Sequence, residues 1–154
     1  MIKEFTGDIL KSDEKIILHQ VNCKGVMGAG IAKQIRDKYP EVYADYRERC
    51  FIYFCNLNGI TPLGTILSSK TMDGKTICNL FAQNGYSKEN CQTDYNALKS
   101  CLEKVNDEFY GETVAIPYKM SCGLAGGDWS IVRKMIEDTL VDCEVHIYKL
   151  EGAV

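Results

Sequence analysis

The sequence predicts an α/β fold, a three-layer α/β/α sandwich with a mixed central sheet of roughly six strands. Apolar runs of strand length alternate with segments of helical periodicity along the 154 residues. Asp73-Gly74 lies between two strand-like runs and signals a hairpin, so one antiparallel pair is expected, whereas helical connections favour parallel pairs. Two glycine-rich segments, residues 25–30 and 117–129, each follow an apolar run and precede a helix-like one. Such segments mark the carboxyl ends of the strands, where sheets of this kind bind their ligands.

The first half of the chain is expected to hold two strands, two helices and the hairpin. Residues 1–5 and 16–21 form the strands, and the second run is apolar on both faces, as in a buried parallel strand. Pro40 ends the first helix and starts the second, because proline lacks the N–H that a helix interior needs. The hairpin strands are residues 63–69 and 75–83. The inward-facing side chains are expected to be Ile31, Ala32 and Ile35 in the first helix, and Val42, Tyr43, Tyr46 and Cys50 in the second.

The second half is expected to alternate between helix and strand. Thr93 and Asp128 are predicted to cap two helices, because their side-chain oxygens can accept hydrogen bonds from first-turn N–H groups. Each helix is followed by a strand, at residues 113–116 and 143–150. The apolar helix stripes are Tyr95, Leu98, Leu102, Val105 and Phe109 in the first, and Val132, Met135, Ile136 and Leu140 in the second.

Composition favours one globular domain over residues 1–154. The formal net charge is −3 with no basic run, which argues against duplex nucleic acid as the main partner. No apolar run approaches membrane-spanning length. The eight cysteines form no C-x-x-C pair and only two histidines are present, so the sequence predicts no zinc site and favours reduced thiols. We therefore expect a cytoplasmic monomer without membrane contact.

The two glycine-rich segments have a chemistry of their own. Glycine lets the backbone approach a ligand closely, and N–H groups at a helix start attract anions. Either segment alone could equally be a strand-to-helix connection that binds nothing. The presence of two in one sheet favours a ligand with two phosphates.

Three segments together resemble the macrodomain family, the ADP-ribose-binding module. They are T-G-D-I at residues 6–9, V-N-C-K-G-V-M-G-A-G-I-A at residues 21–32 and P-Y-K-M-S-C-G-L-A-G-G-D-W at residues 117–129. The resemblance covers almost the whole chain. It is strongest to two branches, the yeast-type ADP-ribose-1″-phosphate phosphatases and the terminal ADP-ribose protein glycohydrolases. The resemblance implies a hydrolase that needs no metal or cofactor and acts on ADP-ribose-1″-phosphate or on ADP-ribosylated macromolecules.

The resemblance also implies roles for individual residues. Asp8, followed by Ile9, would accept a hydrogen bond from the adenine amino group, and Asn22 would contact the distal ribose. Tyr148 would flank adenine, with Tyr118 and Phe81 as other aromatic candidates. Turn residues without a ligand and core aromatics are the alternatives. The phosphate loops would consist of Gly28, Ala29, Gly30 and Ile31, and of Ser121, Cys122, Gly123, Leu124, Ala125 and Gly126.

His19 and Asp128 are the catalytic candidates. The near-neutral pKa of histidine suits general acid–base chemistry, and His19 aligns with a functional histidine of the yeast-type phosphatases. A core histidine with one hydrogen-bonded ring nitrogen is the alternative. Asp128 can activate water or assist a leaving group, and it can cap a helix at the same time.

Two departures bear on the reaction. The glycohydrolase branch has a nucleophilic lysine where this chain has Gln83, and an acid where it has Ala125. An amide cannot form the covalent intermediate that a lysine forms. We therefore expect hydrolysis of ADP-ribose-1″-phosphate to ADP-ribose and phosphate. The alternatives are removal of ADP-ribose from protein or nucleic acid without a catalytic lysine, and a reader that binds ADP-ribose without catalysis.

Overall fold

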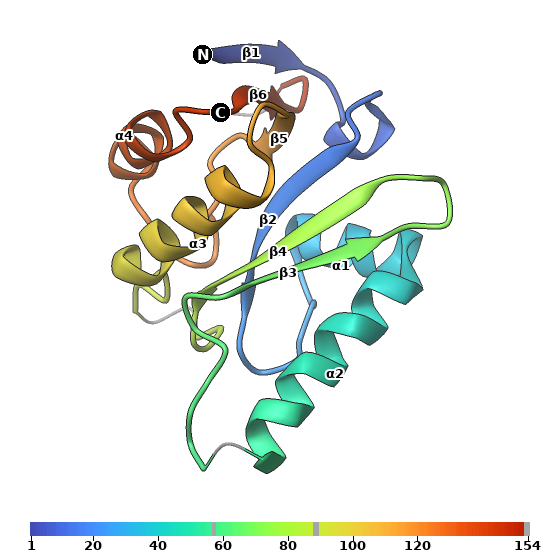
Figure 1. The fold of residues 1–154 in the computed structure, drawn as a ribbon, viewed down its shortest axis with the longest axis vertical. Helices are drawn as coiled ribbons and strands as arrows, with labels where there is room; N and C mark the ends of the chain where they lie inside the picture. Colours follow the sequence, from blue (N-terminus) through green and yellow to red (C-terminus); the bar gives the residue numbers. More distant parts are fainter. Residues whose placement is uncertain (57, 88–89, 153–154) are drawn as a thin grey trace.

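The structure is a computed structural model that describes residues 1–56, 58–87 and 90–152. Six strands form one sheet, and helices cover both of its faces (Figure 1). The strands are β1 (Ile2–Thr6), β2 (Ile16–Asn22), β3 (Ile66–Lys70), β4 (Thr76–Gln83), β5 (Thr113–Pro117) and β6 (Glu144–Lys149). The helices are α1 (Gly30–Lys38), α2 (Pro40–Asn56), α3 (Tyr95–Glu108) and α4 (Trp129–Thr139), with a short 3-10 helix, η1 (Ile9–Lys11).

The sheet is mixed, as predicted. Its strand order is β1-β6-β5-β2-β4-β3, and only β3 and β4 run antiparallel. The hairpin turn at Asp73-Gly74 produces that one antiparallel pair, and Gly74 adopts a positive φ of 88° that suits the turn. β2 lies between two parallel neighbours and is buried over most of its length, as its continuous apolar sequence predicts.

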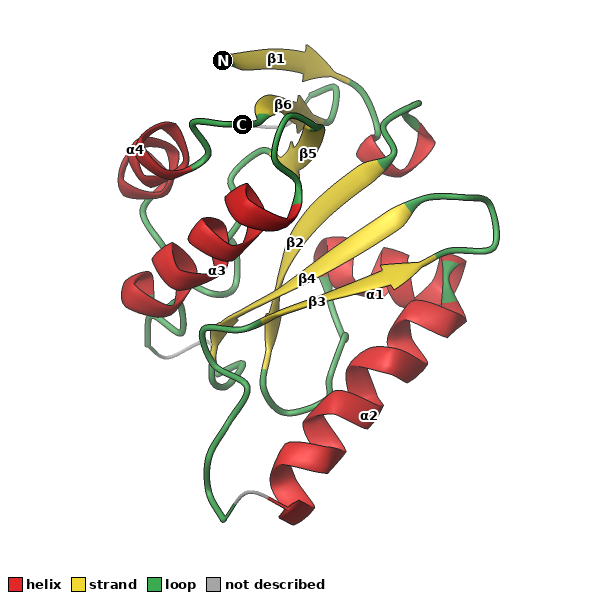
Figure 2. Cartoon of the chain, viewed as in Figure 1, coloured by secondary structure: helices red, strands yellow, loops and turns green. Residues whose placement is uncertain are grey.

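The three layers enclose a core on each side of the sheet. α3 and α4 cover one face, while α1 and α2 cover the other (Figures 1 and 2). On the α3/α4 face, Leu18 and Leu80 of the sheet pack with Leu98, Leu102, Val132 and Ile136. On the opposite face, Ile17 and Ile77 pack with Ile35 and Val42, and Phe81 packs with Tyr46 and Cys50 of α2. The predicted helix stripes thus face the core, with half-buried residues at their margins: Ile31, Ala32, Tyr43, Tyr95, Phe109 and Met135.

One predicted cap is wrong. Asp94, not Thr93, caps α3, and its Oδ1 accepts a hydrogen bond from the Ala97 N–H at 3.0 Å. Thr93 lies one residue earlier, in an isolated bridge to Gln83. Its hydroxyl donates to the Ser121 carbonyl at 2.8 Å instead of to its own helix. A tertiary contact therefore shifts the start of α3 by one residue.

Smaller differences concern strand ends and one missed element. β3 begins at Ile66 and not at residue 63, because residues 62–65 form a turn in which Thr65 donates to the Pro62 carbonyl. The predicted strand at residues 143–150 is shorter by one residue at each end. The short helix η1 was not predicted. Within the described residues, no helix combines the length and the apolar character needed to cross a bilayer.

Candidate functional site

Two loops leave the sheet side by side. Loop 1 (residues 23–29) follows β2, and loop 2 (residues 118–128) follows β5. β2 and β5 are adjacent and parallel, with Ile17 opposite Ala115. Both loops therefore emerge at the carboxyl end of the sheet (Figure 2). This arrangement brings together the two glycine-rich segments that the sequence singled out.

Asn22 holds loop 1 in shape. Its Oδ1 accepts a hydrogen bond from the Lys24 N–H at 2.9 Å, and its Nδ2 donates to the Val26 carbonyl at 2.7 Å. The buried Tyr46 hydroxyl, from α2, lies 2.7 Å from the same Oδ1. Both polar atoms of the Asn22 amide are therefore used within the protein. A contact between Asn22 and a distal ribose stays a prediction, and it would require part of this network to open.

The end of loop 1 is open toward solvent. Gly28, Ala29 and Gly30 are exposed, and Ile31 is half-buried. Ala29 is the N-cap of α1 and has no side-chain oxygen to offer, so the first-turn N–H groups of α1 have no N-cap partner of that kind. Met27, buried in the cluster that contains Tyr46 and Phe81, anchors the loop next to this open end. An uncapped helix start on an anchored loop suits an anionic ligand.

Loop 2 is tightly wound. Lys119 and Ser121 adopt positive φ angles of 58° and 73°, a conformation that side-chain-bearing residues rarely adopt and that concentrates at functional sites. The Gly127 N–H donates to the Ser121 carbonyl at 2.8 Å. A side chain at Gly127 would bring its Cβ to 2.4 Å from that carbonyl oxygen. Only glycine therefore permits this close approach.

A polar network that sequence analysis did not predict joins loop 2 to β2 and β4. The Ser121 hydroxyl donates to Gln20 Oε1 at 2.5 Å, and Gln20 Nε2 donates to the Thr93 hydroxyl at 3.0 Å. Gln20 Nε2 also donates to Gln83 Oε1 at 2.8 Å, and Gln83 Nε2 donates to the Gly85 carbonyl at 2.7 Å. Gln83, which stands where one branch of the family has a lysine, thus has a structural role here.

Asp128 caps α4, as predicted. Its Oδ1 accepts hydrogen bonds from the Ser130 N–H at 2.8 Å and from the Ser130 hydroxyl at 2.6 Å. These bonds lower the pKa of Asp128, so the group is ionised at neutral pH. The side chain is exposed beside loop 2. The capping role is observed, and the catalytic role stays a prediction.

His19 lies inside the sheet. Its side chain is fully buried, and its Nε2 lies 2.7 Å from Asn79 Oδ1 of the neighbouring β4. Burial lowers the pKa of His19 to about 4, although the Asn79 bond opposes the shift. Its Nδ1 has no hydrogen-bond partner among the residues that the structure describes. These features support the core interpretation of His19, and proton transfer by His19 stays an untested prediction.

The third predicted region follows the carboxyl end of β1, the edge strand that runs parallel to β6. Asp8 caps η1 through a hydrogen bond from the Leu10 N–H to its Oδ1 at 2.9 Å, and Ile9 is buried in the core. The Gly7 N–H donates to the Lys149 carbonyl at 2.9 Å, which places this turn beside the end of β6. Asp8 and Tyr148 are therefore brought to the same part of the fold.

Tyr148 does not stand alone there. Its ring stacks on Phe5 with centroids 5.3 Å apart, and its hydroxyl donates to Glu14 Oε1 at 2.9 Å. The sequence did not single out Phe5, although Phe5 and Tyr148 are direct partners in the β1–β6 register. The other two aromatic candidates have structural contacts: Phe81 is fully buried, and Tyr118 packs edge-on against Trp129.

The remaining predicted residues belong to loop 2. Leu124 and Gly123 are exposed, Cys122 is half-buried, and Ala125 is buried with its carbonyl accepting from the Gln92 and Thr93 N–H groups. Gly126 adopts a positive φ of 75°. Within the described residues, no cluster of His, Cys, Asp or Glu side chains could hold a metal ion.

Comparisons with known proteins agree with this geometry. The Macro domain family model matches residues 18–136. The DNA ADP-ribosyl glycohydrolase of Mycobacterium tuberculosis is 29% identical over 158 residues, which cover 99% of this chain but 43% of the relative. The chain thus spans less than half the length of that protein. The ADP-ribose 1″-phosphate phosphatase of Saccharomyces cerevisiae is 28% identical, over 94% of this chain and 96% of the yeast protein.

A solved structure extends the agreement to three dimensions. The macrodomain of Mycobacterium tuberculosis DarG superposes with a TM-score of 0.77 at 28% identity, covering 96% of this chain and 97% of that one. The family model spans both the β2 end that carries loop 1 and the whole of loop 2. The chain belongs to the macro domain family.

Proposed function

We propose that the protein binds ADP-ribose along loops 1 and 2 and hydrolyses ADP-ribose-1″-phosphate to ADP-ribose and phosphate. One observation carries the proposal: two glycine-rich loops follow neighbouring parallel strands, and one of them ends in the uncapped start of α1, a feature that suits an anion. The similarity to the yeast phosphatase over nearly the full length of both chains supports the choice of substrate. We also propose a monomer in the cytoplasm, where reducing conditions suit its eight free thiols.

The proposed ligand runs from one edge of the site to the other. Adenine would lie near Asp8, beside the stacked rings of Phe5 and Tyr148. The diphosphate would then contact backbone N–H groups of the two loops, at Gly28–Ile31 and at Gly123–Ala125. The N–H groups of Cys122 and Gly126 already donate within loop 2, to the Lys119 and Gly123 carbonyls. The distal ribose would reach the start of loop 1 near Asn22. The hydrogen bond from the Gly7 N–H to the Lys149 carbonyl fixes the turn that carries Asp8 beside the end of β6.

The reaction needs one water molecule. Its oxygen attacks the terminal phosphorus, the P–O bond to the ribose breaks, and a proton passes to the released 1″ oxygen. Loop N–H groups would stabilise the charge that develops on the phosphate. Asp128 is a carboxylate whose pKa the Ser130 bonds hold below its ordinary value, so it stays ionised and is suited to accept a hydrogen bond from the attacking water and to orient it.

A second candidate function is removal of ADP-ribose from a macromolecule. The similarity of the chain to a DNA ADP-ribosyl glycohydrolase over 99% of its length favours this candidate. Gln83 is engaged with Gln20 and Gly85, so the reaction could not proceed through a covalent lysine at that position. Water would instead have to attack the ribose carbon directly.

Phosphate release tests the proposal, with a variant that separates the two roles of Asp128. We expect wild type to release phosphate from ADP-ribose-1″-phosphate, and Asp128→Ala to lose at least about tenfold in kcat. Asp128→Ser keeps a good N-cap but removes the carboxylate, so it should match Asp128→Ala in activity while keeping wild-type stability. If calorimetry shows that ADP-ribose binds but no phosphate is released, the protein is a non-catalytic reader and the proposed phosphatase activity is refuted.

A further inference from the structure

A cluster of ionisable side chains on β6 has no part in the proposed reaction. Glu144, His146 and Tyr148 are alternate residues of β6 and so share one face of the sheet. Glu14 reaches them from the connection between β1 and β2, residues 8–15, which we call the η1 segment. The side chains of His146 and Glu14 are only 15% and 16% exposed, so water and salt screen their charges weakly.

Glu14 is the junction of this cluster. Its Oε1 accepts a hydrogen bond from the Tyr148 hydroxyl at 2.9 Å and lies 2.5 Å from His146 Nδ1. One carboxylate oxygen therefore contacts two side chains of β6. The backbone at this point is fixed as well, because Lys75 Nζ donates to the Ser12 and Glu14 carbonyls at 2.7 Å each. Glu14 thus joins the η1 segment to β6 at a defined position.

The adenine end of the proposed site is built on these same elements. Asp8 is the first residue of the η1 segment. Phe5 is 39% exposed, and the centre of its ring lies 4.8 Å from that of His146 and 5.3 Å from that of Tyr148. A shift of Glu14 would therefore move both the carboxylate and the rings that are proposed to lie beside adenine.

Both partners of His146 are hydrogen-bond acceptors. Nδ1 faces Glu14, and Nε2 lies 2.9 Å from Glu144 Oε1. An ionised carboxylate cannot donate, so the two bonds form together only when both ring nitrogens carry a proton. Although burial lowers the pKa of His146, the bonds to Glu144 and Glu14 outweigh it and raise the pKa above the ordinary value. The complete cluster is therefore present at pH 6.5 and loses one bond as pH rises through the raised pKa.

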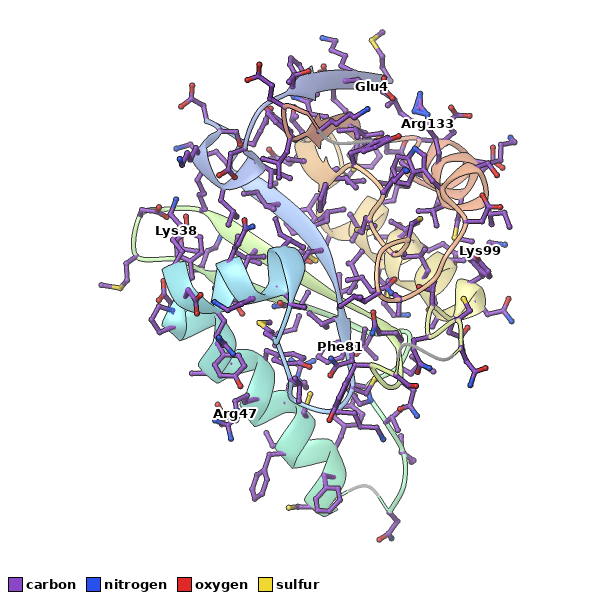
Figure 3. All side chains as sticks on the ribbon, turned by 180° about the vertical axis from the view of Figure 1, so that it is seen from behind. Glu4, Lys38, Arg47, Phe81, Lys99 and Arg133 are labelled. Carbon is purple, nitrogen blue, oxygen red and sulfur yellow. The ribbon has the colours of Figure 1, made fainter. Side chains whose placement is uncertain are left out.

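The neighbouring strands add no third charge to the His146 ring within the described residues. From β1, Lys3 is bonded to Glu144 at 2.8 Å. Glu4 points to the opposite face of the sheet, where Arg133 of α4 lies 3.4 Å away (Figure 3). On β5 the register partner of His146 is the uncharged Ala115. The two carboxylates are thus the groups that govern its protonation.

We propose that Glu14 and His146 are positioning residues for the adenine end of the ADP-ribose site, and that the protonation of His146 makes ADP-ribose binding depend on pH. The two residues do not touch the ligand; they hold Tyr148 and the η1 segment in the arrangement that adenine contacts. The ligand binds more tightly when His146 carries both protons, because only then are both carboxylates fixed. The proposal rests on the proposed binding of ADP-ribose and adds the regulation of that site by pH.

Calorimetry and steady-state kinetics of Glu14→Ala test the positioning role. Loss of a bond to a charged group should weaken ADP-ribose binding and raise KM for ADP-ribose-1″-phosphate by about tenfold, with kcat within about twofold of wild type. Glu14→Gln keeps an oxygen that accepts from Tyr148, so it should recover most of the loss. Glu108→Ala is the matched control, because Glu108 Oε2 accepts from the Ser68 hydroxyl at 2.9 Å on β3, at the opposite edge of the sheet.

The pH profile of ADP-ribose affinity gives an independent readout. ADP-ribose keeps its charge between about pH 6 and 9, because each of its phosphates has a single ionisable oxygen. The other histidine, His19, has a pKa of about 4 and does not titrate in this range. Wild-type affinity should fall by about tenfold as pH rises and His146 loses a proton, whereas His146→Gln should bind with one affinity throughout.

Each outcome decides the inference. Unchanged affinity in Glu14→Ala, or the same pH profile in wild type and His146→Gln, overturns it. If Glu14→Ala does not fold, the His146→Gln profile decides alone. If wild type binds no ADP-ribose, the proposed function fails by itself and AMP replaces it as the probe: AMP binding that weakens in Glu14→Ala supports the inference, and the absence of such binding overturns it.

Discussion

The two histidines of the chain should respond to pH in opposite directions. His19 is buried and its pKa falls from 6.5 to about 4. Each ring nitrogen of His146 lies within hydrogen-bond distance of a carboxylate oxygen, Nδ1 of Glu14 and Nε2 of Glu144, so the protonated ring can donate to both. Although burial lowers the pKa of His146, the bonds to Glu144 and Glu14 outweigh it and raise the pKa above the ordinary value. Substituting each histidine by glutamine therefore removes opposite contributions to stability.

The direction in which stability changes with pH follows from whether the folded or the unfolded state binds the proton more tightly. For His19, the unfolded state gains a proton near pH 6.5, while the folded state resists until about pH 4. Its contribution is present above pH 6.5 and is lost as pH falls toward 4. At about 1.4 kcal/mol per pKa unit, the shift corresponds to about 3 kcal/mol. For His146 the contribution is present below pH 6.5 and is lost as pH rises through the raised pKa.

Urea unfolding at several pH values between 4 and 8 measures both effects. The stability difference between wild type and His19→Gln should shrink as pH falls from 6.5 toward 4, and the difference for His146→Gln should shrink as pH rises above 6.5. His19→Gln should also keep phosphate release within about tenfold of wild type, because His19 does not reach solvent. A pH-independent His19→Gln difference, or a loss of turnover by orders of magnitude at unchanged stability, would refute the core role.

Two further predictions concern the loops. Tyr46→Phe removes the hydroxyl bonded to Asn22 and should lower the free energy of unfolding in urea by about 1–2 kcal/mol. ADP-ribose should also bind more weakly, because loop 1 loosens. Unchanged stability would show that the bond contributes nothing. Gly127→Ala places a Cβ 2.4 Å from the Ser121 carbonyl oxygen and should lower the free energy of unfolding by about 1–3 kcal/mol. In the control Gly123→Ala, the new Cβ meets nothing within 4 Å, so this variant should be as stable as wild type. Equal melting temperatures for the two variants would contradict the close approach.

The fold was predictable because its signals are local. Period-2 and period-3.6 patterns identified the strands and helices, and the Asp73-Gly74 turn identified the antiparallel pair. The N-cap residue of α3 could not be predicted in this way, because the adjacent Thr93 and Asp94 are both good caps. The distant Ser121 carbonyl takes the Thr93 hydroxyl and leaves the cap to Asp94. Sequence spacing carries no sign of that competition.

The site was predictable in outline only. Glycines located both loops, but the bond between Ser121 and Gln20 joins residues 101 positions apart. No local pattern reports such a contact. Similarly, the strand position of His19 was clear from the sequence, whereas its bond to Asn79 depends on the β2–β4 register.

Calorimetric titration with ADP-ribose tests the central claim most directly, with AMP as the matched ligand that lacks the diphosphate and the distal ribose. If loops 1 and 2 hold the diphosphate, ADP-ribose should bind at one site per chain and at least tenfold more tightly than AMP. Gly127→Ala should remove most of that advantage, because it displaces loop 2. Equal affinity for the two ligands, or no heat with either, would contradict the account.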